Sequence, residues 1–271
     1  MPSFLASDSV RLFYERKGTG PPVILIHGWS ASHRSFDLNV EQIAARCTVI
    51  MPDLRFHGRS ERPDWGFHVA RLAADLRELI LDTGVERPTC VGCSLGAAIL
   101  WSYVELFGCD MLGRVCFVDQ APCQWMLPDW TCGSKGIYDE TSLANITALL
   151  MTSISAFADG NATCCLTKPI PSSLLATLKS ETESCIPVHL AKVMQDHAKL
   201  DWRPILPRIT VPALNLYGTE SGCFPIEGLA KVGELIPNAR NEIFIGCNHW
   251  LYMEEPERFS KTICDFAHAL S

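Results

Sequence analysis

Short apolar runs alternate with amphipathic segments along most of the chain. Four runs in the first half have the length and the β-branched content of buried strands: PPVILIHG, CTVIMPDL, PTCVGCS and RVCFVDQAP. Between the second and the third, residues 68–85 (HVARLAADLRELILDTGV) carry apolar side chains at three- and four-residue spacing up to Gly84, where a helix would end. Strands that alternate with helices predict a parallel sheet of the α/β class.

This alternation stops near Pro122 and resumes near Trp202. The intervening stretch contains helix-like segments of mixed polarity, SLANITALLMTSISAF and SSLLATLKSETES. Strand character then returns in VPALNLYG and ARNEIFIGCNHW, and EEPERFSKTICDFAHAL predicts a closing amphipathic helix. No Gly-, Ser- or Pro-rich linker separates two halves, so we predict one core formed by residues 1–121 and 203–271, with residues 122–202 inserted as a helical cap.

Composition and charge narrow the classes of partner. A chain of 271 residues with 48% hydrophobic and 20% charged residues can bury a substantial core. A formal charge of -7 argues against a nucleic-acid or anionic-membrane partner and favours a neutral small molecule. The first residues lack a signal-peptide pattern and no apolar run is long enough to span a bilayer, so we expect a cytoplasmic protein.

Thirteen cysteines raise the question of disulfides or metal ligands. Their number is odd and their positions are scattered, so we expect reduced thiols that pack as small hydrophobic side chains, with no metal site and no cofactor.

The segment TCVGCSLGAAILWSYVEL carries the strongest chemical signal. Gly92, Cys93, Ser94, Leu95 and Gly96 fit the G-x-S-x-G nucleophile elbow, and a β-like run precedes them while a helix-like run follows. The elbow needs small residues on both sides of the serine because the turn is tight and strained. This context predicts that Ser94 is a nucleophile exposed at the end of a strand.

Partners for this serine follow from chain order. His249 lies after the last strand-like run and before the final helix, and a histidine near the C-terminus is the base of a triad in the order serine, acid, histidine. The turn after His27 and Gly28 can direct the Trp29 amide towards the Leu95 amide, and two such donors would form an oxyanion hole.

These segments together resemble the α/β-hydrolase superfamily along nearly the whole chain. The resemblance is carried by HGWS, MPDLRFHGRS, VGCSLG, ITVPALNLYG and CNHW followed by EEPERF. It implies an eight-stranded, mostly parallel sheet flanked by helices, with a variable helical cap after the sixth strand.

The position of the triad acid differs from the commonest pattern of that family. The usual spacing after LYG would place an aspartate at position 221, where this chain has Ser221 preceded by Glu220. Some members, including the zearalenone-type lactone hydrolases and the cofactor-free dioxygenases, carry the acid after the sixth strand, and Cys93 also resembles the elbow cysteine of the zearalenone type. We favour Asp119, which ends an apolar strand, and keep Glu220 as the alternative.

A serine triad of this kind predicts a carboxylic-ester or lactone hydrolase that acts through an acyl-enzyme on a small, fairly apolar molecule. Trp125, Met126 and Trp130 form the most apolar segment of the predicted cap and are candidates for the substrate pocket. A cofactor-independent oxygenase or lyase, an acyltransferase and a non-catalytic receptor on the same fold remain alternatives. The sequence does not indicate an oligomeric state.

Overall fold

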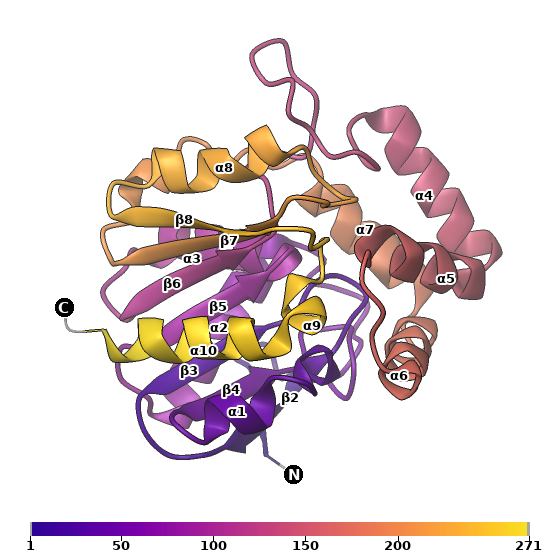
Figure 1. Cartoon of the computed structure of the whole chain (residues 1–271). Coiled ribbons are helices and arrows are strands. Elements are labelled where there is room, and N and C mark those ends of the chain that lie inside the picture. The colour runs from indigo at the N-terminus through magenta and orange to yellow at the C-terminus, as the bar shows by residue number, and fades with distance from the viewer. Residues whose placement is uncertain (1, 270–271) are drawn as a thin grey trace.

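The computed structural model describes residues 2–269. Its strands form one eight-stranded sheet in the order β1-β2-β4-β3-β5-β6-β7-β8 (Figure 1). The strands are β1 Ser3–Leu5, β2 Arg11–Lys17, β3 Pro22–Ile26, β4 Thr48–Pro52, β5 Thr89–Cys93, β6 Arg114–Val118, β7 Ala213–Gly218 and β8 Ala239–Phe244. The β1–β2 and β2–β4 pairs are antiparallel and the other pairs are parallel, which confirms the predicted fold class.

Helices cover both faces of this sheet. The helices of the core are α1 Val40–Ala44, α2 Val69–Thr83, α3 Leu95–Phe107, α8 Ile226–Leu235, α9 Leu251–Glu254 and α10 Pro256–His268, with short 3₁₀ turns η1 His33–Phe36 and η2 Leu206–Arg208. Side chains of α2, α3 and α8 pack on one face and those of α1, α9 and α10 on the other. Strands β3 to β7 therefore bury both of their faces, which explains why they are continuous apolar runs.

The alternation of side chains along a strand divides the core into these two halves. On β5, Cys90 packs in the half beneath α2 and α3, whereas Cys93 packs in the half beneath α1 and α10. All thirteen cysteines of the chain lie in the described part and are free thiols.

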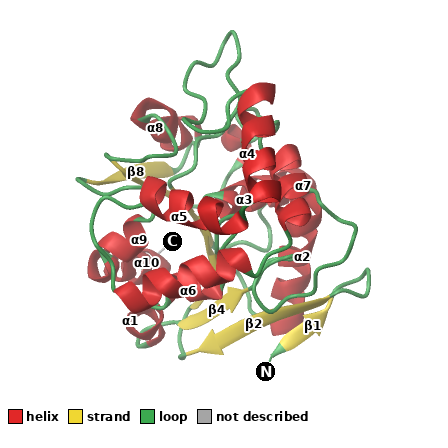
Figure 2. Cartoon of the chain, turned by 90° about the vertical axis from the view of Figure 1, so that its right-hand side faces the viewer, coloured by secondary structure: helices red, strands yellow, loops and turns green. Residues whose placement is uncertain are grey.

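Four further helices lie between β6 and β7: α4 Glu140–Thr152, α5 Ile154–Cys165, α6 Ser172–Glu183 and α7 Pro187–His197. They stand beside the sheet, over the end to which the parallel strands point, and Figure 2 views the molecule from their side. The segment SLANITALLMTSISAF is divided between α4 and α5. Ser153 interrupts it with an extended backbone and caps α5 by accepting a hydrogen bond from Ala156 N at 3.1 Å.

The predicted helix before β5 forms as expected. It spans Val69–Thr83, and Gly84 ends it with φ of 65°, a left-handed conformation that glycine adopts without steric cost. Among the described residues, no helix is both long enough and apolar enough to cross a membrane.

Candidate active site

Ser94 lies at the turn between β5 and α3. Its φ of 53° and ψ of -117° are strained for a residue with a side chain. A Cβ atom on Gly92 would lie 2.3 Å from the Gly96 carbonyl oxygen, and one on Gly96 would lie 2.5 Å from the Ile26 carbonyl oxygen. Both glycines are therefore required by the close approach of backbone to backbone, and they allow the turn that presents Ser94.

Two backbone amides border the serine. Gly28 is so close that a Cβ atom on it would lie 3.2 Å from Ser94 Cβ, and this places the Trp29 backbone beside the elbow. Leu95 is the first residue of α3, where amide groups have no partner within the helix. The Trp29 and Leu95 backbones thus both lie next to Ser94, and their roles as oxyanion-hole donors stay a prediction.

Asp119 and His249 form a hydrogen-bonded pair inside the protein. His249 Nδ1 lies 2.7 Å from Asp119 Oδ1, and the Asp119 side chain is fully buried. The same Oδ1 accepts a bond from Ser221 Oγ at 2.7 Å, and Oδ2 accepts one from Gly218 N at 3.0 Å. Three hydrogen-bond partners therefore fix the orientation of this buried carboxylate.

Backbone geometry places the aspartate there. Asp119 directly follows β6 and has a φ of 47°, so it shares with Ser94 a left-handed conformation that is unusual for a residue with a side chain. His249 lies in the loop between β8 and α9, and its amide donates to Asn248 Oδ1 at 2.7 Å. Strain at both strand ends is consistent with a functional site.

The alternative acid lies elsewhere. Glu220 is exposed, and its Oε1 accepts a hydrogen bond from the neighbouring Thr219 hydroxyl at 3.2 Å. Ser221, which occupies the position where the resemblance would place an acid, donates to Asp119 instead. The carboxylate next to the imidazole thus comes from the end of β6, while the end of β7 supplies a hydroxyl that holds it.

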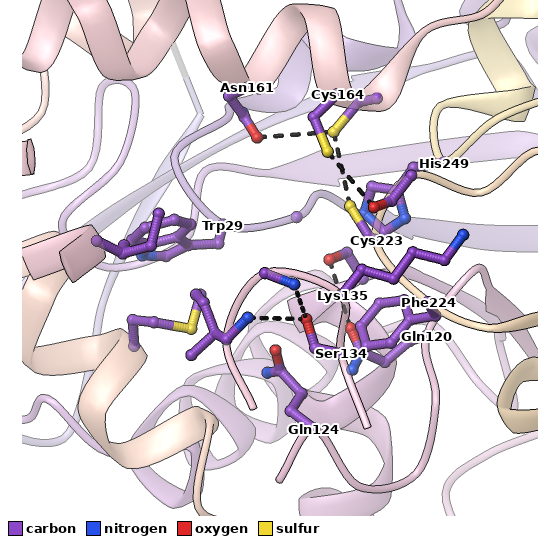
Figure 3. A pocket seen from close by; sticks show the side chains of 18 of the residues that line it. Trp29, Gln120, Gln124, Ser134, Lys135, Asn161, Cys164, Cys223, Phe224 and His249 are labelled. Atoms are coloured by element: carbon purple, nitrogen blue, oxygen red, sulfur yellow. Dashed lines mark hydrogen bonds between the residues drawn. The ribbon is translucent and has the colours of Figure 1, made fainter. Parts of the chain in front are cut away.

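A cavity of about 360 Å³ opens beside these groups. Figure 3 shows its lining, with His249 and Cys223 on one side, Trp29 on another, and Gln120 and Gln124 below. The remaining wall is mostly apolar. It is supplied largely by the segment between β6 and β7, through Ile137, Ile146, Leu149, Phe157 and Met194, and further by Phe224, Trp250 and Tyr252. A volume of this size suits a small organic molecule.

The three aromatic and apolar candidates for the pocket are not among the residues that line it. Trp130 packs in a separate core cluster and donates its indole N–H to the Cys123 carbonyl at 3.0 Å. Trp125 lies against the buried side chains behind the cavity, and Met126 is exposed. This corrects the predicted placement: other residues of the same loop, among them Gln124 and Ile137, line the cavity together with helices α4, α5 and α7.

Ser94 also contacts a residue that the motif does not indicate. Its Oγ lies 3.4 Å from Gln120 Oε1, and the Gln120 amide nitrogen donates to the Ala121 carbonyl at 3.1 Å, which fixes the orientation of the side chain. Gln120 follows Asp119 in the sequence, so the same strand end positions both. Its role could not be predicted because an apolar strand followed by a polar residue is common.

The electrostatics of the imidazole involve a thiol as well as a carboxylate. Burial lowers the pKa of His249, but the neighbouring Cys223 and Asp119 outweigh this effect and raise it above its ordinary range. Hydrogen bonds with the Cys164 and Cys165 thiols, together with the imidazole, hold the pKa of Cys223 below its ordinary range. In the molecules whose His249 is neutral, a raised pKa makes the imidazole a stronger base for a hydroxyl proton.

Two other histidines support the turns around the site from inside. His57 Nδ1 lies 2.8 Å from the Arg55 carbonyl, and its Nε2 accepts a bond from Ser30 N at 3.1 Å. His27 makes the same two kinds of contact with the backbone. Burial lowers the pKa of His27 to about 4 and that of His57 to about 3, so both rings are neutral near pH 7 and hold the backbone in place.

Comparison with known proteins places this geometry in a family. The model of the α/β hydrolase fold matches residues 21–120 and 191–256, which is more than half of the chain and includes both Ser94 and His249. The chain belongs to the α/β-hydrolase fold family. The unmatched stretch between the two segments contains α4, α5 and α6.

Relatives of this α/β hydrolase extend over its full length. The pimeloyl-[acyl-carrier protein] methyl ester esterase of Vibrio vulnificus is 26% identical over 96% of this chain and 99% of its own. An esterase from Exiguobacterium antarcticum has a TM-score of 0.93 at 22% identity, covering 98% of this chain and 99% of its own. A bromoperoxidase from Bacillus anthracis has a TM-score of 0.91 at 24% identity, covering 99% and 100%. The last two likenesses establish the fold alone.

Proposed function

We propose that this protein is a serine hydrolase that cleaves a carboxylic ester or lactone, with Ser94 as nucleophile, His249 as base and Asp119 as acid. The observation that carries the proposal is the buried bond of 2.7 Å between His249 Nδ1 and Asp119 Oδ1, on the same cavity that Ser94 lines. A methyl ester esterase among the full-length relatives supports the same reaction class.

Each step follows from the roles of these groups. His249 accepts the Ser94 proton as Oγ attacks the carbonyl carbon, and the Trp29 and Leu95 amides stabilise the oxyanion. The tetrahedral intermediate collapses, the alcohol leaves with that proton, and an acyl-Ser94 ester remains. His249 then activates a water molecule, which releases the acid and restores the serine. Asp119 holds the imidazole in the required tautomer throughout.

The cavity favours a compact substrate that is apolar over most of its surface. Two buried polar groups on its wall, Gln124 Nε2 and His197 Nδ1, have no hydrogen-bond partner among the described residues. A buried donor without a partner is costly, and a substrate acceptor would satisfy it. We therefore expect a substrate with one polar group beyond the scissile carbonyl.

Hydrolysis of a panel of small esters and lactones tests the proposal. The panel varies acyl size at constant leaving group, and the rates are compared between wild type, Ser94→Ala and the exposed-site control Ser173→Ala. We expect the control to match wild type and Ser94→Ala to lose at least about a thousandfold in kcat/KM. Full turnover by a folded Ser94→Ala protein would refute the assignment of the nucleophile.

A further inference from the structure

Three soft metal ligands converge on the wall of the cavity. The sulfurs of Cys165 and Cys223 and a ring nitrogen of His249 all lie within 4.8 Å of one another. Cys165 ends α5 in the cap, Cys223 follows β7, and His249 follows β8, so elements distant in sequence bring them together. Figure 3 shows two members of this cluster, Cys223 and His249, close together on the wall of the cavity.

We propose that Cys165, Cys223 and His249 form an inhibitory site for a soft divalent metal ion, for which Zn²⁺ is the best fit. Two thiolates bound to one tetrahedral Zn²⁺ at about 2.3 Å lie about 3.8 Å apart. Cys165 Sγ and Cys223 Sγ are separated by 3.9 Å. The pair thus already has the spacing of a zinc site, whereas a disulfide of about 2.05 Å would require a large approach of the two sulfurs.

The imidazole is prepared for the same role. Asp119 holds Nδ1, so Nε2 is the nitrogen left for a metal, and a carboxylate behind the imidazole is the arrangement that orients histidine ligands of zinc. A sulfur and a nitrogen bound to one Zn²⁺ lie about 3.6 Å apart. The three ligand atoms here lie within 4.8 Å of one another, so side-chain rotations that move them by about 1 Å would complete the site.

Charge and access also fit. Cys165 and His249 are buried and Cys223 is half-buried, yet all three line the cavity, so an ion can reach them. On binding, every proton still held by the two thiols and by His249 Nε2 passes to solvent, so that two thiolates and the Nε2 lone pair bind the ion with no change of oxidation state. Two thiolates neutralise the doubly charged ion, which removes most of the cost of placing it inside the protein.

Inhibition follows from the shared ligand, and this part rests on the proposed function. The Nε2 lone pair that binds the metal is the one that would accept the Ser94 proton. Metal binding and general-base catalysis therefore exclude each other.

Titration of the reduced full chain with Co²⁺ tests the site without any reference to turnover. Thiolate ligation gives a charge-transfer absorption that Zn²⁺ should abolish by displacement. We expect Cys165→Ser and Cys223→Ser each to weaken Co²⁺ binding at least about tenfold, and Cys132→Ser, a partly buried thiol outside the cluster, to leave it unchanged. Equal affinity in all four proteins would overturn the proposal.

X-ray absorption of the zinc-loaded wild type gives a second measurement that does not depend on how well the variants fold. It should show two sulfur ligands at about 2.3 Å and at least one nitrogen at about 2.0 Å. A shell of oxygen and nitrogen alone would overturn the proposal.

The inhibitory half is tested with an ester that wild type hydrolyses. Zn²⁺ should lower kcat at the occupancy given by the titration, and a chelator should restore it. Unchanged turnover by the zinc-loaded enzyme would overturn this half. If Ser94 proves not to be the nucleophile, the cobalt spectrum still decides the site, and if the cobalt spectrum is absent, labelling of Ser94 still decides the hydrolase.

Discussion

Replacement of Asp119 by asparagine should abolish most activity while keeping the shape of the side chain. Three donors point at the carboxylate: the His249 imidazole and the Ser221 hydroxyl at Oδ1, and the Gly218 amide at Oδ2. An asparagine has one oxygen, so one of the two sites must receive an NH₂ group. The choice between them determines the tautomer of His249.

The Gly218 amide cannot reverse its role, because a backbone N–H only donates. The Ser221 hydroxyl can rotate to accept a bond, and His249 can shift its proton from Nδ1 to Nε2. The NH₂ group of Asp119→Asn should therefore face His249 and hold the tautomer that cannot accept a proton from Ser94. In a serine protease the corresponding change lowers kcat about 10⁴-fold, which equals roughly 5 kcal/mol of transition-state stabilisation.

The assay compares Asp119→Asn with Glu220→Gln, which also removes one negative charge but lies on the exposed surface. The measurements are kcat on an ester, the free energy of unfolding in urea, and the ¹⁵N shifts of the His249 ring, which report its tautomer. We expect a loss of about 10³- to 10⁴-fold for Asp119→Asn and near wild-type activity for Glu220→Gln. A crippled Glu220→Gln beside a nearly normal Asp119→Asn would refute the assignment of the acid.

Three further predictions concern stability and cofactors. The pKa values of about 4 for His27 and about 3 for His57 in the folded protein lie below the value of about 6.5 for an unfolded chain. Below pH 6.5 the two histidines are therefore protonated in the unfolded chain but stay neutral in the folded protein, which favours unfolding. Urea unfolding should thus show stability falling from pH 6.5 to pH 4, by up to ~1.4 kcal/mol per pH unit for each ring, and a flat profile would contradict their neutral burial. Gly96→Ala should destabilise the protein by about 1–3 kcal/mol, because its Cβ would lie 2.5 Å from the Ile26 carbonyl oxygen. Gly160→Ala, where the new Cβ meets open space within α5, should stabilise the protein by about 0.5–1 kcal/mol. Stability changes of the same sign in thermal unfolding would refute this account. A chelator should not lower kcat, because the triad uses no metal, and a loss that added metal restores would contradict this.

Sequence alone predicted the parts of the molecule that depend on short-range pattern. The parallel strands β3 to β7 are visible because each is buried on both faces, and the elbow is visible because backbone contacts at Gly92 and Gly96 exclude side chains. Strands β1 and β2 do not appear as apolar runs, since about half of their residues face solvent. Their presence followed only from the family resemblance.

The wall of the cavity could not be predicted in the same way. Aromatic residues are common in cores as well as in pockets, and only the folded chain shows that Trp130 packs in a core cluster while Phe157 of α5 lines the cavity. The cluster of Cys165, Cys223 and His249 joins three segments that are distant in the sequence, so no local spacing of residues predicts it. The hydrogen bond from the Ser221 hydroxyl to Asp119 likewise depends on the folded structure and could not be predicted from the sequence.

The central claim is that Ser94 is a nucleophile activated by His249. An organophosphonate ester, which reacts covalently with activated serines, tests it when the intact mass of the protein and the mass of the peptide that carries Ser94 are followed in time. We predict one phosphonyl group per chain at Ser94, a rate that falls at least about a hundredfold in His249→Ala, and no adduct in Ser94→Ala. A wild-type protein that hydrolyses esters but stays unlabelled at Ser94, or that is labelled as fast without His249, would contradict the account.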